Sequence, residues 1–280
     1  MADIQDNQAE LESVRTIHAM SGVMRDIAAT RTAELRNKYH QNVAFYTEVR
    51  DLYAVIRGIV QQQGSEKKPP KASWGIVATS SQHFYGGLNR DVVEYFIKHI
   101  DQYDDCLIIG KTGKQYIEQA GYADRCDFQS FKDDIPDTEG IQVLIQQMSK
   151  YDKVDIYYPA YKTPFFQEPK SFDINARPNE EGGGKTGLNE EYITEPELSK
   201  LYDFFRTHVK LMLFRRVLLE TDLARSSARL MKMHSAEEAS EDMIGDLTKQ
   251  ITKNKRNAEN VELLETVVAL KQWQKLQENK

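Results

Sequence analysis

The segment Tyr192-Ile193-Thr194-Glu195-Pro196-Glu197 decides the fold, because it carries the last proline of the chain. All eight prolines fall between Pro69 and Pro196. A proline inside a helix removes a backbone hydrogen bond and clashes with the preceding turn, at a cost of about 3 kcal/mol. The absence of proline before Pro69 and after Pro196 therefore permits one long helix at each end of the chain.

These two helices are too long for an ordinary globular core. At 1.5 Å per residue, a helix from Glu10 to Val60 is about 75 Å long, and one from Pro196 to Leu276 is about 120 Å long. Such lengths are typical of a coiled coil, a membrane span or a helical repeat. The sequence has no run of about 18 apolar residues, which argues against a membrane span. The economical solution is an antiparallel coiled coil of the two ends.

Apolar side chains in the N-terminal helix recur in steps of three and four, the spacing of a coiled-coil seam. This spacing predicts one stripe that faces a partner helix. The segment 64–70 contains glycine and two prolines and is predicted to end the helix as a linker. The predicted seam contains Leu35, Tyr39, Asn42, Tyr46, Val49, Tyr53, Ile56 and Val60, and upstream of them Met20, Met24, Ile27 and Arg31.

The C-terminal helix has a clear start, since Thr194 can cap it and Pro196 suits its first turn. Two polar residues, Glu237 and Ser240, fall on its seam, so we expect loose packing there or contact with another chain. The predicted seam contains Leu201, Phe205, Val209, Met212, Leu219, Leu223, Ser226, Leu230, Met233, Ile244, Leu247, Ile251, Ala258, Val261 and Val268.

The middle of the chain has the pattern of an α/β domain. Short apolar runs predict strands at 74–79, 106–109 and 154–158, with helices at 91–100, 114–121 and 138–150. Their alternation favours a Rossmann-like, mostly parallel sheet covered by helices. We predict a coiled-coil shaft of residues 1–68 and 195–280 and a foot domain of residues 69–194. Within the foot, the prolines, glycines and charges of 162–194 predict a partly mobile surface segment.

Composition narrows the class of protein. A net charge of −6 argues against a nucleic-acid partner, which would favour a basic surface. The acidic N-terminus has neither a signal peptide nor a transit peptide pattern. Two cysteines, Cys106 and Cys126, are expected to be free thiols in the core of the α/β domain and in a reducing compartment. We therefore expect a cytoplasmic protein that can dock on a membrane-bound partner.

Three glycine turns could bind phosphate. Gly184-Lys185-Thr186 and Gly110-Lys111-Thr112 resemble the end of a Walker A loop, but Asn179 and Asp105 replace the upstream glycine that the loop requires. The turn 86–89 either places an anion at a helix N-terminus or is a tight turn with Asn89 as the cap. We favour the turn. The six histidines have no metal-ligand spacing and no catalytic triad is visible, so we expect no cofactor, no metal and no active site.

Motifs along nearly the whole chain resemble those of one family. Residues 13–31 contain Val23-Met24-Arg25-Asp26-Ile27-Ala28-Ala29-Thr30-Arg31, and residues 79–89 end in Gly86-Gly87-Leu88-Asn89. Further along come Tyr192-Ile193-Thr194-Glu195-Pro196-Glu197, Leu219-Glu220, Ser227-Ala228-Arg229-Leu230-Met231-Lys232-Met233 and Glu262-Leu263-Leu264-Glu265. In order, spacing and total length these segments are similar to the gamma subunit, or central stalk, of the F-type ATP synthase.

The resemblance implies a non-catalytic rotary subunit. The terminal helices would form an asymmetric shaft inside a hexamer of alpha and beta subunits, and the foot would bind an epsilon-type subunit and the membrane rotor ring. Ion flow would turn ring and shaft, coupled to ATP synthesis or hydrolysis, at the inner face of an energy-transducing membrane such as the bacterial plasma membrane. The implied partner-contact residues are Met24, Arg25, Arg31, Arg225, Arg229, Lys255, Arg256 and Glu262, each of which could instead be an ordinary seam or surface residue.

The chain departs from the family in two places. Ser81-Gln82-His83-Phe84-Tyr85 stands where the family usually has Asp-Arg-Gly-Leu-Cys. Residues 255–260 occupy the region of its Arg-Gln and Ile-Thr pairs, which are not clearly present. A divergent gamma subunit or the shaft of a specialised F-type paralogue fits this pattern. Two other readings stay open. The chain could be a soluble nucleotide-binding protein with dimerising arms, or a coiled-coil tether that holds a scaffold domain on a partner.

Overall fold

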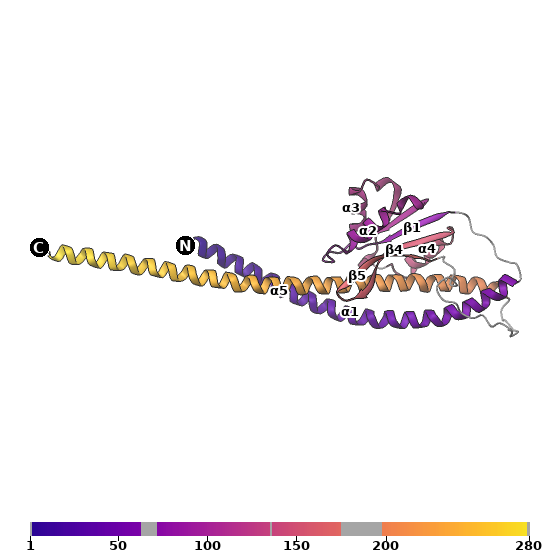
Figure 1. Cartoon of the computed structure of the whole chain (residues 1–280), viewed down its shortest axis with the longest axis horizontal. Coiled ribbons are helices and arrows are strands. Elements are labelled where there is room, and N and C mark those ends of the chain that lie inside the picture. The colour runs from indigo at the N-terminus through magenta and orange to yellow at the C-terminus, as the bar shows by residue number, and fades with distance from the viewer. Residues whose placement is uncertain (1, 63–71, 135, 175–197, 279–280) are drawn as a thin grey trace. The chain divides into compact units, whose positions relative to one another are not determined.

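A computed structural model describes residues 2–62, 72–134, 136–174 and 198–278 (Figure 1). The two longest elements are helices α1 (Ala2–Gln62) and α5 (Leu198–Glu278). Between them lie β1 (Ser73–Ala78), α2 (Leu88–Ile97), η1 (Ile100–Gln102), β2 (Asp105–Ile109), α3 (Lys111–Gln119), η2 (Ala123–Arg125), β3 (Cys126–Gln129), η3 (Lys132–Asp134), α4 (Thr138–Met148), β4 (Lys153–Thr163) and β5 (Phe166–Asp173). The prediction of a long helix at each end is confirmed.

The chain divides into two compact units, which we describe separately. One contains residues 1–27 and 232–280, and the other contains residues 28–231. The division passes through both long helices. It therefore does not coincide with the shaft and foot expected from the sequence, and those domain boundaries stay a prediction. The linker 64–70, the start of the C-terminal helix at 194–197 and Gly184-Lys185-Thr186 lie outside the described residues.

In the unit of residues 1–27 and 232–280, α1 and α5 run antiparallel. Leu11 and Val14 form a buried cluster with Leu247 and Ile251. Further along α1, His18 contacts Ser240, so residue numbers rise on one helix as they fall on the other. The α5 helix continues past the N-terminal end of α1 in Figure 1, and the described side chains from residue 255 to residue 271 are exposed.

In the unit of residues 28–231, five strands form one sheet in the order β3-β2-β1-β4-β5. The pairs of β1 with β2, β2 with β3 and β1 with β4 are parallel, and only β4 with β5 is antiparallel. This arrangement confirms the predicted Rossmann-like, mostly parallel sheet. The three predicted strands are present, but β3 and β5 were not predicted. The stretch expected to be a surface segment from residue 162 onward contains the end of β4 and all of β5.

Both faces of the sheet are buried, which explains the continuous apolar strands β1 and β2. On one face, Ile76 and Ile156 pack with Leu144 of α4 and Phe214 of α5. On the other face, Val77 and the ring of Tyr157 pack with α2 and α3. The central part of α5 therefore covers the sheet directly, in the manner of an α/β domain helix, while it also pairs with α1. Arg31 of α1 forms an ion pair with Asp222 of α5 at 2.9 Å in this unit.

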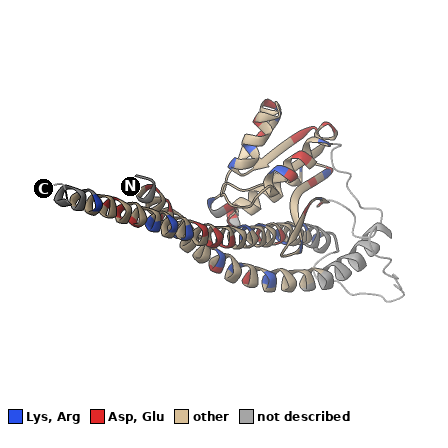
Figure 2. Cartoon of the chain, turned by 60° about the vertical axis from the view of Figure 1, so that its left-hand side comes forward, with Lys and Arg blue, Asp and Glu red and all other residues tan. Residues whose placement is uncertain are grey.

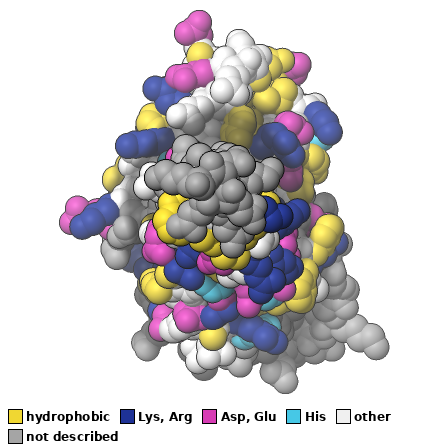
Figure 3. Space-filling view, turned by 90° about the vertical axis from the view of Figure 1, so that its left-hand side faces the viewer, with side chains coloured by type: hydrophobic (Ala, Val, Ile, Leu, Met, Phe, Trp, Pro, Cys, Tyr) yellow, Lys and Arg dark blue, Asp and Glu magenta, His cyan; other side chains and the backbone are white. Residues whose placement is uncertain are grey.

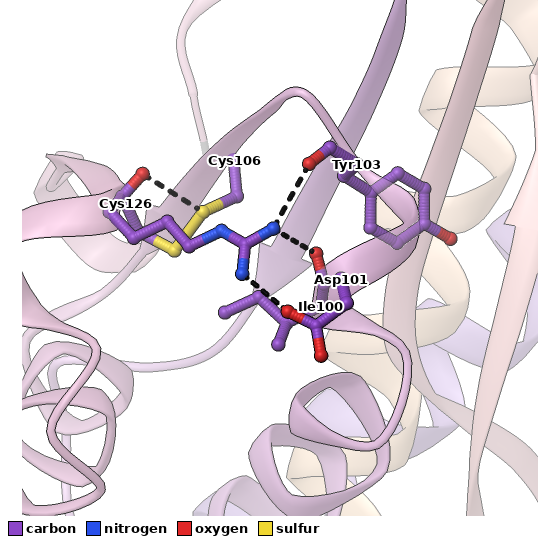
Figure 4. Close-up of a disulfide and its surroundings, with 6 residues drawn as sticks. Ile100, Asp101, Tyr103, Cys106 and Cys126 are labelled. Carbon is purple, nitrogen blue, oxygen red and sulfur yellow. Dashed lines mark hydrogen bonds and ion pairs between the residues drawn. A yellow bond between two sulfur atoms is a disulfide. The ribbon is translucent and has the colours of Figure 1, made fainter.

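Cys106 and Cys126 form a disulfide (Figure 4), so the prediction of two free thiols is wrong. They lie opposite each other in the parallel register of β2 and β3, with their Cα atoms 4.7 Å apart. The error follows from the missed strand β3, because without it no element brings Cys126 beside Cys106.

Candidate functional site

A polar cluster occupies the seam between α1 and α5 in the unit of residues 1–27 and 232–280. Arg25 Nη1 lies 2.5 Å from Glu237 Oε2, and His18 Nδ1 lies 3.2 Å from both the Glu237 carbonyl oxygen and Ser240 Oγ. Ser240 is buried, with 4% of its surface exposed. The expectation of loose packing at Glu237 and Ser240 is therefore wrong, because side chains from α1 fill these positions.

Arg25 is held on both sides by carboxylates. Its guanidinium also donates to Asp26 at 2.9 Å. The hydrogen bond to Asp26 and the charges of Asp26 and Glu237 raise the pKa of Arg25 above its ordinary value, against the opposing effect of desolvation. Gly22 makes room for this pairing, because a Cβ atom there would lie 3.2 Å from Glu237 Oε1. Arg25, a predicted partner-contact residue, is thus engaged within its own chain.

A stripe of large apolar side chains lies on the outer side of α1. We call it the α1 stripe; its exposed side chains are Ile17, Met20, Val23, Met24 and Ile27. The sequence placed Met20, Met24 and Ile27 in the seam, and this prediction is wrong. The buried positions lie one residue further along and carry smaller side chains: Ser21, Ala28 and Thr32. Small residues let the two helices approach closely, which leaves the larger apolar groups outside.

The end of α5 carries the second exposed set. Lys255, Arg256 and Glu262 are exposed, and their contact with a partner stays a prediction. Val261 and Val268 were predicted in the seam, but they are 55% and 53% exposed. Among the described residues, the last buried seam position is Ile251.

Charges of both signs are mixed along the surface. Figure 2 shows basic and acidic residues interspersed along the described parts of α1 and α5. Figure 3, which views the molecule from the side that carries both termini, shows acidic, basic and apolar side chains interspersed.

Arg225 is an internal residue, in contrast to the partner contact that the sequence implied. It is 3% exposed, and its Nη1 lies 3.5 Å from the carbonyl oxygen of Asp134. Burial lowers the pKa of Arg225, and the charges of Asp134, Tyr85 and Asp222 partly oppose that change. The Asp134 carboxylate in turn accepts hydrogen bonds from the Ser80 hydroxyl and the Ser81 N–H. This cluster therefore ties α5 to the carboxyl end of β1.

Arg229 lies one helical turn from Arg225 and holds the 81–85 segment. Its Nη2 donates to Gln82 Oε1 and Tyr85 Oη, each at 2.7 Å, and its guanidinium carbon lies 4.6 Å from the centre of the Tyr85 ring. Burial raises the pKa of Tyr85, against the opposing charge of Arg229. Gln82 and Tyr85 belong to the segment that departs from the family pattern, so this chain supplies its own partners for Arg229.

The glycine turns serve close packing. Gly86 has φ +62°, and Gly87 rather than Asn89 is the cap of α2, so the assignment of Asn89 as the cap is wrong. Asn89 is instead buried in the first turn of α2. At Gly110, φ is +99° and a Cβ atom would lie 2.5 Å from the Thr79 carbonyl oxygen. These positions need glycine to bring strand ends and helix starts together.

The sequence analysis missed His18 and Asp134 as members of these clusters, and it missed the contact between His18 and Glu237. Asp134 carries a positive φ of 61°, which its sequence context of Lys132-Asp133-Asp134 does not reveal. His18 falls on the 3–4 rhythm with Leu11, Val14 and Ser21, so a seam drawn through small residues would have found it. Within the described residues, no three His, Cys, Asp or Glu side chains are grouped to hold a metal ion. No helix in the described ranges is long and apolar enough to cross a membrane.

Comparison with known proteins connects this architecture to one family. The family model described as ATP synthase matches residues 3–271. The chain belongs to the ATP synthase family. The "ATP synthase gamma chain" of Psychrobacter arcticus is 23% identical, with 95% of this chain and 98% of that one covered. The gamma chain of Bacteroides fragilis strain ATCC 25285 is 20% identical, with 95% of this chain and 98% of that one covered.

Solved structures of ATP synthases have the same fold. A chain of the Euglena gracilis mitochondrial ATP synthase, in a structure of its OSCP, F1 and c-ring, has a TM-score of 0.66 at 14% identity and covers 96% of this chain and 94% of its own length. A chain from the Tetrahymena thermophila central stalk and c-ring has a TM-score of 0.57 at 14% identity, covering 78% and 99%. The resemblance seen in the sequence motifs is therefore confirmed over the whole chain of this ATP synthase family member.

Proposed function

We propose that the chain is the central rotary stalk of an ATP synthase and couples rotation of a membrane ring to nucleotide chemistry in an alpha–beta hexamer. The observation that carries this proposal is the match from residue 3 to residue 271 to one family. The arrangement of a single chain whose two long terminal helices pair antiparallel around an inserted α/β unit supports it. In this role the chain itself is non-catalytic, and the hexamer carries out synthesis or hydrolysis of ATP.

The α1 stripe supports a contact with the hexamer. Ile17, Met20 and Ile27 are 53%, 60% and 62% exposed, and large apolar groups gathered on one helix face are typical of a protein–protein contact. We assign this stripe, with Met24 at 38% exposure, to the bearing formed by the alpha and beta subunits. The exposed Lys255, Arg256 and Glu262 on α5 are assigned to the same hexamer. Arg31 contributes through its partly exposed guanidinium.

The asymmetry of the shaft gives the coupling its direction. The stripe lies on one side of α1, and the rest of the helix pair carries mixed charges (Figure 2). A rotating shaft of this kind presents an apolar face to each beta subunit in turn. A ligand-binding subunit that contacts two different faces in succession can be shifted between two states by the difference in contact free energy.

The foot is assigned to an epsilon-type subunit and the membrane ring. The β4–β5 hairpin ends in two exposed aromatic rings, Phe165 and Phe166, at 78% and 55% exposure. Lys162 holds this tip through an ion pair with Glu168 at 2.7 Å and lies 5.8 Å from the centre of the Phe166 ring. Exposed aromatic side chains are typical of a protein–protein contact. The assembly would place the chain at the cytoplasmic face of a bacterial plasma membrane as a peripheral subunit.

Reconstitution with the alpha, beta and epsilon subunits and the ring-containing membrane sector of the same organism tests the proposal. The tagged chain is expected to copurify with a hexamer whose ATP hydrolysis pumps ions into vesicles. Ile27→Asp should keep the fold of the isolated chain, because Ile27 is exposed, yet it should weaken assembly or reduce pumping per ATP at least tenfold. Val143→Asp, at another exposed apolar site, on α4 (49% exposed against 62% for Ile27), is the control and should retain both.

Two results would refute the assignment. One is failure of the wild-type chain to enter any complex with the hexamer while tight ATP binding appears in calorimetry of the chain alone. The other is parallel self-association of the chain, seen as a crosslink between engineered cysteines at Met24 of two copies. The stalk assignment instead requires an intramolecular crosslink between Gly22→Cys and Glu237→Cys, which face each other in the structure.

A further inference from the structure

We propose that Cys106–Cys126 is a site of reversible thiol–disulfide exchange, opened by a dithiol reductant that attacks Cys126. That the bond meets a reducing environment rests on the proposed function, which places the foot of the stalk on the cytoplasmic side of a membrane. Disulfides of cytosolic proteins are rare and are usually transient or redox-sensing. The bond joins two neighbouring parallel strands at residues directly opposite in register.

The two sulfur atoms differ in accessibility. Cys106 lies in the core cluster with Ile108 and Ile117 and is 3% exposed. Cys126 begins the edge strand β3 and is partly exposed, and its neighbours Arg125 and Asp127 are exposed. An external thiolate therefore reaches Cys126 Sγ more readily than Cys106 Sγ, and Cys106 is the leaving group.

The exchange balances without any further reactant. A thiolate of the dithiol forms a bond to Cys126 Sγ as the Cys106–Cys126 bond breaks, and Cys106 leaves as a thiolate that takes a proton. The second thiolate of the dithiol then attacks its own sulfur in the mixed disulfide, and Cys126 leaves and is protonated. Two electrons and two protons pass from the dithiol to this chain, and the reductant becomes a disulfide.

The structure also offers the reduced Cys106 thiol a hydrogen-bond acceptor. Cys106 Sγ lies 3.3 Å from the carbonyl oxygen of Arg125 (Figure 4). A disulfide sulfur has no hydrogen to donate, but a Cys106 thiol in the same position would donate to this oxygen. On reduction, the buried Cys106 sulfur would therefore lose its covalent bond and gain a hydrogen bond, so the buried S–H group would not be left unpaired.

The expected consequence is local release of β3. This strand has four paired positions with β2, and its side chains are exposed or partly exposed, including Phe128 at 39%. Beside the bond, Arg125 ties the strand to the η1 turn, through Asp101 Oδ1 at 2.6 Å and the Ile100 carbonyl at 3.0 Å (Figure 4). Segments with few apolar contacts open at low free-energy cost once a crosslink is removed.

The test uses the isolated full chain, purified without reductant. One millimolar dithiothreitol, or thioredoxin as a protein dithiol, should make both cysteines alkylatable within minutes in the native protein. Thioredoxin lacking its resolving cysteine should trap at Cys126 at least tenfold more than at Cys106, as read by peptide mass. Amide exchange of residues 126–129 should accelerate at least tenfold on reduction, and that of β4 should stay unchanged.

Cys106→Ser/Cys126→Ser is the matched control, in which dithiothreitol should leave amide exchange unaltered. The proposal is overturned by a bond that resists reduction until the chain unfolds, by trapping at Cys106, or by two thiols that do not form the bond in air or with oxidised dithiothreitol. These measurements use the chain alone. If the redox response is absent but the chain copurifies with the hexamer, this proposal is refuted and the stalk assignment stands. If the redox response is present but the chain does not copurify with the hexamer, the stalk assignment is refuted and this proposal stands.

Discussion

Arg25 on α1 and Glu237 on α5 form an ion pair across the seam of the helix pair, with 2.5 Å between Nη1 and Oε2. The pair takes the place of an apolar layer where the sequence of α5 offers only polar groups. Glu237 is the more enclosed partner, with 18% of its side chain exposed against 35% for Arg25. A charged layer of this kind fixes register, because a slip of either helix leaves a partly buried carboxylate without its partner.

Arg25→Ala should lower the free energy of unfolding by clearly more than Arg15→Ala does, since it leaves the Glu237 carboxylate partly buried and unpaired. Urea denaturation followed by circular dichroism measures this loss. Arg15→Ala is the control: Arg15 pairs only with Glu12 on its own helix, and both side chains are more than half exposed, so the change should be below about 0.5 kcal/mol. Equal losses from the two variants would contradict the assigned role of the seam pair.

Thr32→Val should stabilise the chain. Thr32 is 8% exposed in the helix seam, and its Oγ1 has no hydrogen-bond partner among the described residues. Replacing an unpaired buried hydroxyl by a methyl group of similar shape should raise the free energy of unfolding by about 1 kcal/mol. The matched variant Thr221→Val should show the opposite sign, because the Thr221 hydroxyl, also buried, donates to the Val217 carbonyl oxygen at 2.7 Å. Thermal unfolding of both variants measures the contrast.

The seam shows what the sequence could predict and what it could not. The proline distribution and the 3–4 rhythm were sufficient for two long paired helices. They placed several buried seam positions correctly, namely Leu35 on α1 and Val209, Leu223, Ser226, Met233, Leu247 and Ile251 on α5. Upstream of Leu35 they did not identify the buried face of α1, because apolar size favoured Met20 and Ile27, whereas close approach favoured Ser21 and Ala28. A periodic pattern reports that a face is apolar. It does not report whether the chain's own partner helix covers that face or leaves it for another protein.

The α/β unit shows the same limit at the edges of its sheet. The central strands β1, β2 and β4 are buried on both faces and read as apolar runs, so they were predicted. The edge strands β3 and β5 do not read as apolar runs. Polar residues interrupt them, namely Asp127 and Gln129 in β3 and Glu168 and Lys170 in β5. With β3 missed, the disulfide was missed, and Cys126 had no predicted neighbour. The Arg229 contacts with Gln82 and Tyr85 arise where the chain departs from its family, and no general motif could have predicted them.

Gly110→Ala should be strongly destabilising, whereas Gly121→Ala should be mild. Both residues have positive φ, +99° and +83°, which an alanine adopts with strain. At Gly110 the new Cβ atom would also lie 2.5 Å from the Thr79 carbonyl oxygen, and at Gly121 nothing lies within 4 Å. We expect a loss of roughly 1 kcal/mol at Gly121 and more than about 3 kcal/mol at Gly110. Similar losses in denaturant titrations would show that backbone strain alone, and not the approach of β1, determines the glycine at position 110.

The buried carboxyl of Glu220 should make stability depend on pH. Glu220 is 6% exposed and accepts a hydrogen bond from the Tyr158 hydroxyl at 3.2 Å. Burial raises the pKa of Glu220 above its ordinary value, more than Arg216 and the Tyr158 hydrogen bond lower it. The folded chain therefore binds this proton more tightly than the unfolded chain does. Its contribution to stability is present below the ordinary glutamate pKa and is lost as pH rises through the raised pKa of the folded state.

Glu220→Gln isolates that contribution, because the amide keeps an acceptor for Tyr158 and cannot ionise. The variant should be more stable than the wild type at pH 7.5, and the difference in unfolding free energy should shrink as the pH falls toward 4. Glu262→Gln, at an exposed position on α5, is the control variant. Unfolding by urea at a series of pH values between 4 and 8 measures all three proteins. A wild type that gains stability relative to Glu220→Gln as pH rises would mean that the attraction of Arg216 outweighs the cost of burying the charge.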